Sequence, residues 1–280
     1  MKKYALIGHP LGHSMSPLIH YRMFGLSGCE ECVYELTDIA PEKLESSMEY
    51  LRTLSGFNIT IPHKVSIIPM LDSLDESAAR YNAVNCVKND NGRLTGYNTD
   101  CYGFLKSVEN MPLGGNVLLL GCGGAGRMMG IEAARHGASL TIAVRSSSVK
   151  KAQLLMAEIL SKCSSAKIRI TDISSIEGSY DLLLNATPVG MYPNVQECPV
   201  SHSVIERCGS FFDVIYNPTD TVLLKTASNL GKPAVGGAAM LVYQAAKAHE
   251  IWDGDTYTPE QLQAIIAETE NAVETMQKNT

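Results

Sequence analysis

One glycine-rich segment constrains the fold of this chain more than any other feature. Residues 121–126 read Gly-Cys-Gly-Gly-Ala-Gly, after the apolar run 117–120 and before residues 128–136, whose apolar positions recur with a helical period. In the pattern G-x-G-x-x-G the glycines permit a sharp turn, close approach of a pyrophosphate and tight packing of helix on strand. The free N–H groups of the following helix favour an anion. We therefore expect a Rossmann-type dinucleotide site with contacts from Gly121, Gly123, Gly124, Ala125 and Gly126.

Apolar runs and helical periods alternate along most of the chain. Strands are predicted at residues 4–8, 32–36, 57–61, 117–120, 140–144, 168–170, 182–184 and 211–215. Helices are predicted at residues 17–26, 41–54, 65–71, 128–136 and 149–160, and in the tail at 238–251 and 259–276. A hairpin is predicted at residues 84–97, because Asn91 and Gly92 suit its turn. The alternation predicts the α/β class, with mainly parallel sheets covered by helices.

The length of 280 residues suits two domains. The pattern changes near residue 100 and again near residue 237, so we expect one domain to be inserted into another. The first would comprise residues 1–101 and 238–280, with the C-terminal helices returning to it. The second, a Rossmann-type domain, would comprise residues 102–237.

The composition argues against several classes of protein. Hydrophobic residues make up 45% of the chain and charged residues 19%, which is too apolar for disorder, and the apolar runs are too short to span a membrane. A net charge of -6 disfavours nucleic-acid binding as the main role. We therefore expect a small-molecule partner, with no nucleic acid and no membrane.

The N-terminal segment and the cysteines indicate a cytoplasmic protein. The apolar stretch 5–7 is shorter than the core of a signal peptide. Cysteines at irregular spacings favour free thiols in a reducing compartment. Cys29 and Cys32 form a C-x-x-C pair, but no second pair completes a zinc site, so no metal is predicted. The cysteines expected as free thiols are Cys29, Cys32, Cys86, Cys101, Cys122, Cys163, Cys198 and Cys208.

The residues after the predicted strand 140–144 indicate which dinucleotide binds. An NAD-selective site places a carboxylate there, against the ribose 2'-hydroxyl, whereas this chain has Arg145 and Ser146. Arg145 could stack on the adenine and pair with a 2'-phosphate, with Ser146 donating and Lys150 or Lys151 adding charge. These residues predict NADP(H), and a solvated arginine at a strand end is the alternative reading.

Three polar segments of the N-terminal half follow predicted strands. Ser14 and Ser16 lie just before a helix start, where hydroxyls and free N–H groups favour a small carboxylate. Lys64 and Asp100 each follow a strand end, where open α/β sheets bind ligands, and each can transfer a proton. An N-cap turn, a solvated lysine and a capping aspartate remain the structural alternatives.

Several short motifs, in a fixed order, give the chain a family resemblance. They are G-x-P-x-x-H-S-x-S-P at residues 8–17, N-x-T-x-P-x-K at 58–64, N-A-V-N at 82–85, G-x-N-T-D-x-x-G at 96–103, the glycine loop, N-A-T-P-x-G-M at 185–191, D-x-x-Y-x-P at 213–218 and G-x-x-M-L-x-x-Q at 237–244. With these motifs the chain resembles the shikimate and quinate dehydrogenase family.

This resemblance implies a substrate domain, an NADP domain and the reversible NADPH-dependent reduction of 3-dehydroshikimate to shikimate, in aromatic amino acid and chorismate biosynthesis. It assigns catalysis to Lys64 and Asp100. The implied substrate-binding residues are Ser14, Ser16, Thr60, Asn85, Tyr216 and Gln244, and the further cofactor positions are Thr187, Gly237 and Met240.

Three departures from the family pattern affect the cofactor site. Val144 replaces the usual asparagine, Ser146 the usual threonine and Val149 a second basic residue, which leaves the strength of the NADP preference open. The alternatives are a quinate/shikimate dehydrogenase with broader substrate or NAD use, and a nucleotide-binding regulator without activity. Ser16 and Val144 favour the shikimate enzyme over the quinate one. The expected assembly is a monomer or a homodimer.

Overall fold

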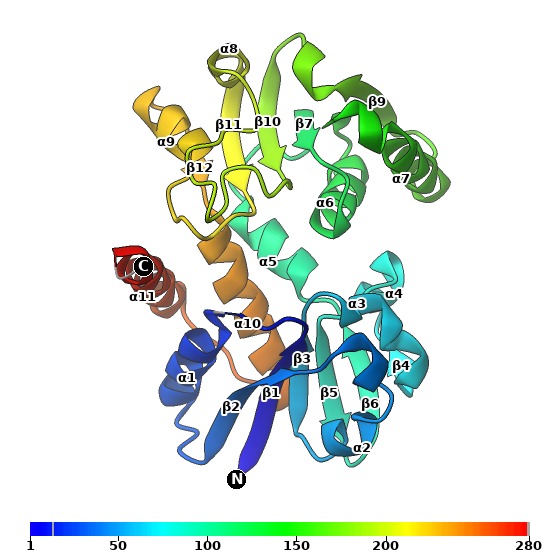
Figure 1. Cartoon of the computed structure of the whole chain (residues 1–280), viewed down its shortest axis with the longest axis vertical. Helices are drawn as coiled ribbons and strands as arrows, with labels where there is room; N and C mark the ends of the chain where they lie inside the picture. The colour runs from blue at the N-terminus through cyan, green and yellow to red at the C-terminus, as the bar shows by residue number, and fades with distance from the viewer. Residues whose placement is uncertain (13, 279–280) are drawn as a thin grey trace. The chain divides into compact units, whose positions relative to one another are not determined.

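The structure is a computed structural model that describes residues 1–12 and 14–278. The chain divides into two compact units. The first contains Met1–Gly103 and Leu241–Thr269, and the second contains Phe104–Met240 and the chain from Glu270 onward. Each unit holds a six-stranded sheet with helices, so the predicted α/β class is confirmed (Figure 1).

The sheet of the first unit is mixed and has the order β2-β1-β3-β5-β6-β4. β1 pairs in parallel with β2 and β3, β4 pairs in parallel with β6, and β5 is antiparallel to both of its neighbours. The carboxyl ends of β1, β3 and β6 therefore lie at one edge, together with the start of β5. The strands are β1 (Lys2–Gly8), β2 (Cys32–Asp38), β3 (Gly56–Ile59), β4 (Ser73–Leu74), β5 (Cys86–Asp90) and β6 (Arg93–Tyr97).

Both faces of this sheet are covered. On β1, Ala5 and Ile7 face a core that includes Phe57, while Tyr4 and Leu6 face the opposite core. Successive side chains of a strand point to opposite faces of the sheet, so β1 contributes apolar residues to a core on each side. The helices of the unit are α1 (Ser16–Ser27), α2 (Met48–Leu51), α3 (His63–Ser66) and α4 (Glu76–Tyr81), with part of α10 (Gly237–Asp253) and of α11 (Pro259–Lys278).

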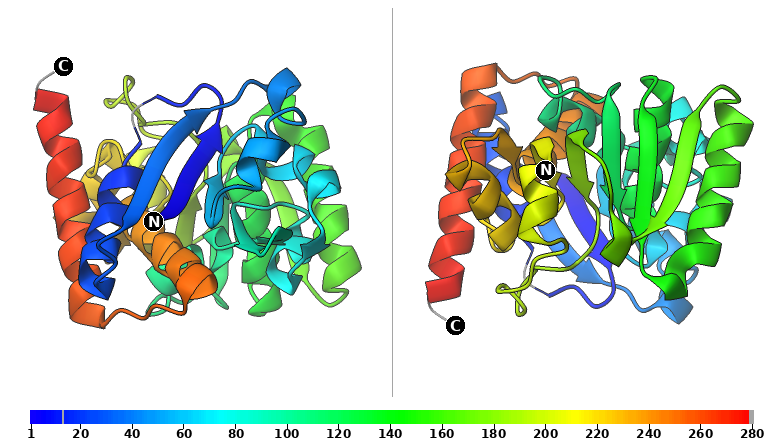
Figure 2. Two further views of the ribbon diagram at one scale, coloured as in Figure 1. Left: turned by 90° about the horizontal axis from the view of Figure 1, so that it is seen from below. Right: turned by 90° about the horizontal axis from the view of Figure 1, so that it is seen from above.

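The sheet of the second unit is entirely parallel and has the order β12-β11-β10-β7-β8-β9. This is the doubly wound Rossmann order, which reverses between β7 and β10. The right-hand view of Figure 2 shows its green strands side by side. The strands are β7 (Asn116–Leu120), β8 (Ser139–Val144), β9 (Lys167–Asp172), β10 (Tyr180–Asn185), β11 (Cys208–Asp213) and β12 (Ala234–Val235), and the main helices are α6 (Gly124–Arg135), α7 (Val149–Lys162), α8 (His202–Glu206) and α9 (Val222–Asn229).

Some helices differ from the sequence prediction. Residues 41–54 form a 3-10 turn at Pro41–Lys43 and the short α2, rather than one helix. α6 begins at Gly124, four residues before the predicted start, because the glycine loop itself enters the helix. α4, α8, α9 and α5 (Asp100–Ser107) were not predicted, since helices of five to eight residues contain too few turns for a clear period.

The cysteine prediction is wrong for one pair. Cys29 and Cys32 form a disulfide, with their Cα atoms 5.7 Å apart. Gly28, in the left-handed conformation, ends α1 directly before Cys29, and β2 begins at Cys32, so the turn brings the two thiols together. The other six cysteines are thiols that form no disulfide within the described part of the chain, as predicted. Within the described part of the chain, no helix is both long enough and apolar enough to cross a membrane.

Candidate active site

An ion pair lies at the strand-end edge of the first sheet. Lys64 stands in α3, just after β3, and Asp100 is the first residue of α5, just after β6. The Nζ atom of Lys64 lies 2.6 Å from Oδ2 of Asp100. The two side chains are 30% and 18% exposed, so the pair is accessible to a ligand while most of its surface is covered. The structure therefore brings the two predicted proton-transfer groups into direct contact.

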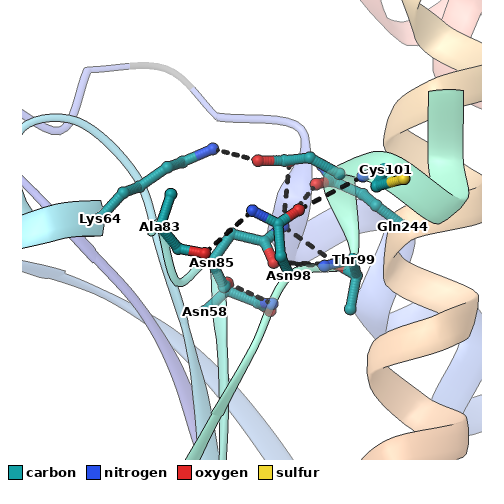
Figure 3. Close-up of polar contacts among 9 residues, drawn as sticks. Asn58, Lys64, Ala83, Asn85, Asn98, Thr99, Cys101 and Gln244 are labelled. Carbon is teal, nitrogen blue, oxygen red and sulfur yellow. Dashed lines mark hydrogen bonds and ion pairs between the residues drawn. The ribbon is translucent and has the colours of Figure 1, made fainter. Parts of the chain in front are cut away.

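Asn85, just before β5, holds the other oxygen of the aspartate. Its Nδ2 atom lies 2.9 Å from Oδ1 of Asp100, 3.1 Å from Oε1 of Gln244 and 3.0 Å from Oγ1 of Thr99. Its Oδ1 atom accepts a hydrogen bond of 2.6 Å from the N–H of Thr99. Figure 3 shows Asn85 between Lys64, Thr99 and Gln244. Both oxygens of the carboxylate are thus occupied by donors, which orients Asp100 toward Lys64.

Two side chains without an assigned role extend this network toward the serine loop. Tyr34 on β2 donates to Oδ1 of Asn58 at 2.8 Å, and Nδ2 of Asn58 donates to the carbonyl of Asn85 at 3.2 Å. The side chain of Ser16 lies close to the hydroxyl of Tyr34. Asn58 opens a recognised motif and could have been predicted, whereas Tyr34 reads in the sequence as an ordinary strand aromatic. Burial raises the pKa of Tyr34 well above its usual range.

The serine loop and Thr60 follow neighbouring strands. Ser14 Oγ accepts a hydrogen bond of 3.2 Å from the N–H of Ser16, the first residue of α1. Thr60 follows β3, and its N–H donates to the carbonyl of Ile7 on β1. Because β1 and β3 are parallel neighbours, both segments leave the same edge of the sheet.

A pair of buried histidines lies beside Tyr34. His20 on α1 stacks on Tyr34 with ring centroids 4.0 Å apart. Nδ1 of His20 lies 3.0 Å from Nε2 of His249 on α10, and Nδ1 of His249 lies 2.9 Å from the hydroxyl of Tyr257.

The hydrogen bonds set the protonation of this pair. Tyr257 donates to the carbonyl of Met23, so its oxygen accepts from Nδ1 of His249. Nε2 of His249 is then free to accept from Nδ1 of His20, and Nε2 of a neutral His20 carries no proton. Both rings are neutral in this arrangement. Burial lowers the pKa of His249 to about 4 and that of His20 well below its usual value, in agreement with neutral rings.

The glycine loop of the second unit has the form of an anion cradle. The backbone of Gly123 precedes α6, and that helix start receives no hydrogen bond from a capping side chain. A Cβ atom on Gly123 or Gly124 would meet no heavy atom within 4 Å, so space is open over the helix start. A Cβ on Gly126 would lie 2.6 Å from the carbonyl oxygen of Gly121, so the close packing of α6 on β7 requires glycine. These features fit a bound pyrophosphate.

The other predicted cofactor residues lie in the same unit. Thr187 follows β10, the strand next to β7, and its hydroxyl donates to Oδ1 of Asn185 at 2.7 Å. Arg145 and Lys150 are exposed at and after the end of β8, and Gly237 donates its N–H to the carbonyl of Ile215 at 3.0 Å. Thr187 and the glycine loop therefore leave the sheet at the point where its strand order reverses, which is where such sheets bind ligands. Tyr216 is half-buried and Met240 is buried.

Comparisons with known proteins agree with this geometry. Residues 6–87 match the family described as the shikimate dehydrogenase substrate binding domain. The protein of Caldanaerobacter subterraneus named shikimate dehydrogenase (NADP(+)) is 39% identical over 91% of this chain and 93% of its own length. The chain belongs to the shikimate dehydrogenase family. A solved shikimate dehydrogenase in complex with NADP+ superposes with a TM-score of 0.87 at 35% identity, and each chain is covered to 95%. The Thermus thermophilus shikimate 5-dehydrogenase in complex with NADP(H) and shikimate has a TM-score of 0.84 at 30% identity, with 96% of this chain and 100% of that chain covered.

Membership of the shikimate dehydrogenase family confirms several of the sequence expectations. The predicted family, the oxidoreductase class, the NADP cofactor and a small-molecule ligand all agree with these relatives. The roles of individual residues remain predictions. The structure joins Lys64, Asp100, Asn85 and Gln244 in one network.

Proposed function

We propose that this protein catalyses the reversible NADPH-dependent reduction of 3-dehydroshikimate to shikimate, a step toward chorismate and the aromatic amino acids. The observation that carries the proposal is the Lys64–Asp100 ion pair, which Asn85 holds at the strand-end edge of the first unit's sheet. The first unit would be the substrate domain and the second the NADP(H) domain. The sequence predicts boundaries at 1–101 with 238–280 and at 102–237, whereas the contacts assign the chain from Glu270 onward to the second unit.

The reaction needs one hydride and one proton. When bound, NADPH would supply the hydride that converts the ketone carbon to an alcohol carbon. The ammonium of Lys64 stabilises the negative charge that develops on the oxygen and donates the proton to it. In the reverse direction the neutral amine of Lys64 accepts that proton. Asp100 keeps the amine oriented, since its Oδ2 contacts Nζ and its Oδ1 is held by Asn85.

The remaining site residues bind and orient the substrate. Ser14 and Ser16 would hold the carboxylate with hydroxyls, and Thr60, Asn85 and Gln244 would bind the ring hydroxyls, with Tyr216 near the carboxylate. The contact of Ser16 with Tyr34 supports this set, because it links the serine loop to the network of Asn58 and Asn85.

The cofactor would lie along the second unit. The pyrophosphate would bind Gly121, Gly123, Gly124, Ala125 and Gly126, and the 2'-phosphate would bind Arg145 and Lys150. Ser146, predicted as a further phosphate ligand, donates its hydroxyl hydrogen bond to Asp172 in this structure. Thr187, Gly237 and Met240 would lie near the nicotinamide half. A monomeric or homodimeric assembly and a cytoplasmic location stay predictions.

The test is a spectrophotometric assay of the purified protein with shikimate and NADP+, repeated with quinate and with NAD+. The proposal expects NADPH to form with shikimate and much less product to form with quinate. Faster turnover of quinate than of shikimate would identify the broader enzyme instead. A folded protein that binds NADP+ but never reduces it would be a regulator, which contradicts the proposal.

A further inference from the structure

An acidic residue lies beside the predicted 2'-phosphate site, on the neighbouring strand. Asp172 ends β9 and pairs in register with Val144, the last residue of β8. Oδ2 of Asp172 accepts a hydrogen bond of 2.8 Å from the hydroxyl of Ser146. Its Oδ1 atom accepts from the N–H and the hydroxyl of Ser174, at 2.9 Å and 2.7 Å. Ser146, expected to donate to a phosphate, therefore already donates to a carboxylate.

The hydrogen bonds of Asp172 favour its ionised form. Its hydrogen bonds with Ser174 and Ser146 stabilise the charged form and hold the pKa of Asp172 below its usual value. The residues that directly follow β8 in the sequence, Arg145 to Ser148, include no acid. The neighbouring strand supplies one, because the parallel register places residues 144 and 172 side by side.

The charge acts on the two cofactors differently. NADP(H) carries a phosphate on the 2'-oxygen and is repelled by a nearby carboxylate, whereas NAD(H) has a neutral 2'-hydroxyl there. Val149 stands where a second basic residue would offset the repulsion, so Arg145 and Lys150 are the cations nearest in sequence.

We propose that Asp172 is a specificity-determining residue that weakens discrimination in favour of the 2'-phosphorylated cofactor. The enzyme then uses NAD(H) alongside NADP(H). The inference rests on the proposed function, because it assumes that the adenosine half of a dinucleotide lies at the end of β8. It extends that function by identifying the group that sets the cofactor range.

The test is calorimetric titration with two fragments, adenosine 2',5'-bisphosphate and 5'-AMP, which needs no substrate and no turnover. In Asp172→Asn the amide oxygen still caps Ser174, and only the charge is removed. The bisphosphate is expected to bind about tenfold more tightly to this variant, and 5'-AMP with unchanged affinity. Glu177→Gln is the matched control, because it removes an exposed charge from the same β9–β10 connection and should alter neither affinity.

A second variant tests the hydrogen bond itself. Ser146→Ala should change bisphosphate affinity little in the wild-type background, where the hydroxyl is bound to Asp172. In the Asp172→Asn background the hydroxyl is free to donate to the phosphate, so the same change should weaken binding by about fivefold or more. Equal effects in the two backgrounds would show that the two residues are not coupled through the phosphate and would overturn the inference.

Two further outcomes separate the inference from the function on which it rests. If the wild type binds both fragments and Asp172→Asn tightens neither, the inference fails and the cofactor site stands. If the wild type binds neither fragment, the dinucleotide site itself is wrong, and the inference fails with it.

Discussion

At the scale of single residues, the carboxylate of Asp100 links the side chains to which we assign the proton transfer. Asp100 contacts Lys64 through Oδ2 and Asn85 through Oδ1, and Asn85 reaches Gln244. A carboxylate held on both oxygens cannot rotate freely, so the amine of Lys64 is presented in one direction. The geometry therefore favours Lys64 as the group that exchanges a proton with the substrate oxygen.

Lys64→Ala removes that group. We expect kcat to fall by about 100-fold or more, the range typical of general acid–base residues, with KM much less affected. Steady-state rates with shikimate and NADP+ measure both constants. Lys43→Ala, at an exposed position in the 3-10 turn Pro41–Lys43, is the control and should leave both unchanged. Near-normal turnover of the Lys64 variant would refute the role.

The packing of α1 against α10 contains the buried histidine pair. A histidine with a lowered pKa stays neutral in the folded protein, while the unfolded chain takes up a proton as the pH falls below 6.5. The unfolded state then binds more protons, so the free energy of unfolding falls as the pH drops from 6.5 toward the folded value of about 4. Above this window the contribution is fully present.

His249→Phe removes one of these groups. When the pH is lowered from about 7 to about 5, the free energy of unfolding should fall in both proteins. The fall should be about 2 kcal/mol smaller in the variant than in the wild type. Urea unfolding at the two pH values measures this difference. Val242→Ala, at a fully buried position of the same helix, should lower stability equally at both. An unchanged pH dependence in His249→Phe would contradict the neutral pair.

Replacing glycine by alanine should change the free energy of unfolding in opposite directions at two positions. Gly92 has a φ of +92° in the β5–β6 turn, so Gly92→Ala should lower the free energy of unfolding by about 1 kcal/mol. Gly25 is exposed within α1 with open space around its Cα, so Gly25→Ala should raise it by about 0.5 kcal/mol. Urea denaturation measures both, and effects of the same sign would contradict the assigned conformations. Activity should not change in either variant.

At the scale of the whole molecule, local patterns predicted the architecture well. The glycine loop, the alternation of strands and helices and the Asn91–Gly92 turn each depend on neighbouring residues, and the structure contains all three. The strand-end rule also selected Lys64 and Asp100, because open sheets place polar ends at one edge. Short helices such as α4 and α8 were not predicted, because their sequences contain only one or two turns.

Contacts between distant segments could not be predicted in this way. His20 meets His249 across 229 positions of sequence, and the Asp172–Ser146 contact depends on strand register. Tyr34 looks like any buried strand residue until its hydroxyl is seen to reach Asn58. The C-x-x-C spacing of Cys29 and Cys32 does not predict their disulfide, because the bond depends on the turn that joins α1 to β2.

The central claim is that Lys64 and Asp100 act as one proton-transferring unit, and a double-mutant cycle on kcat tests it most directly. Lys64→Ala, Asp100→Ala and the double variant are compared with the wild type in the shikimate and NADP+ assay. If the two residues act together, the double variant should be about as slow as the slower single variant. Losses that multiply in the double variant would show that the residues act independently and would contradict the account.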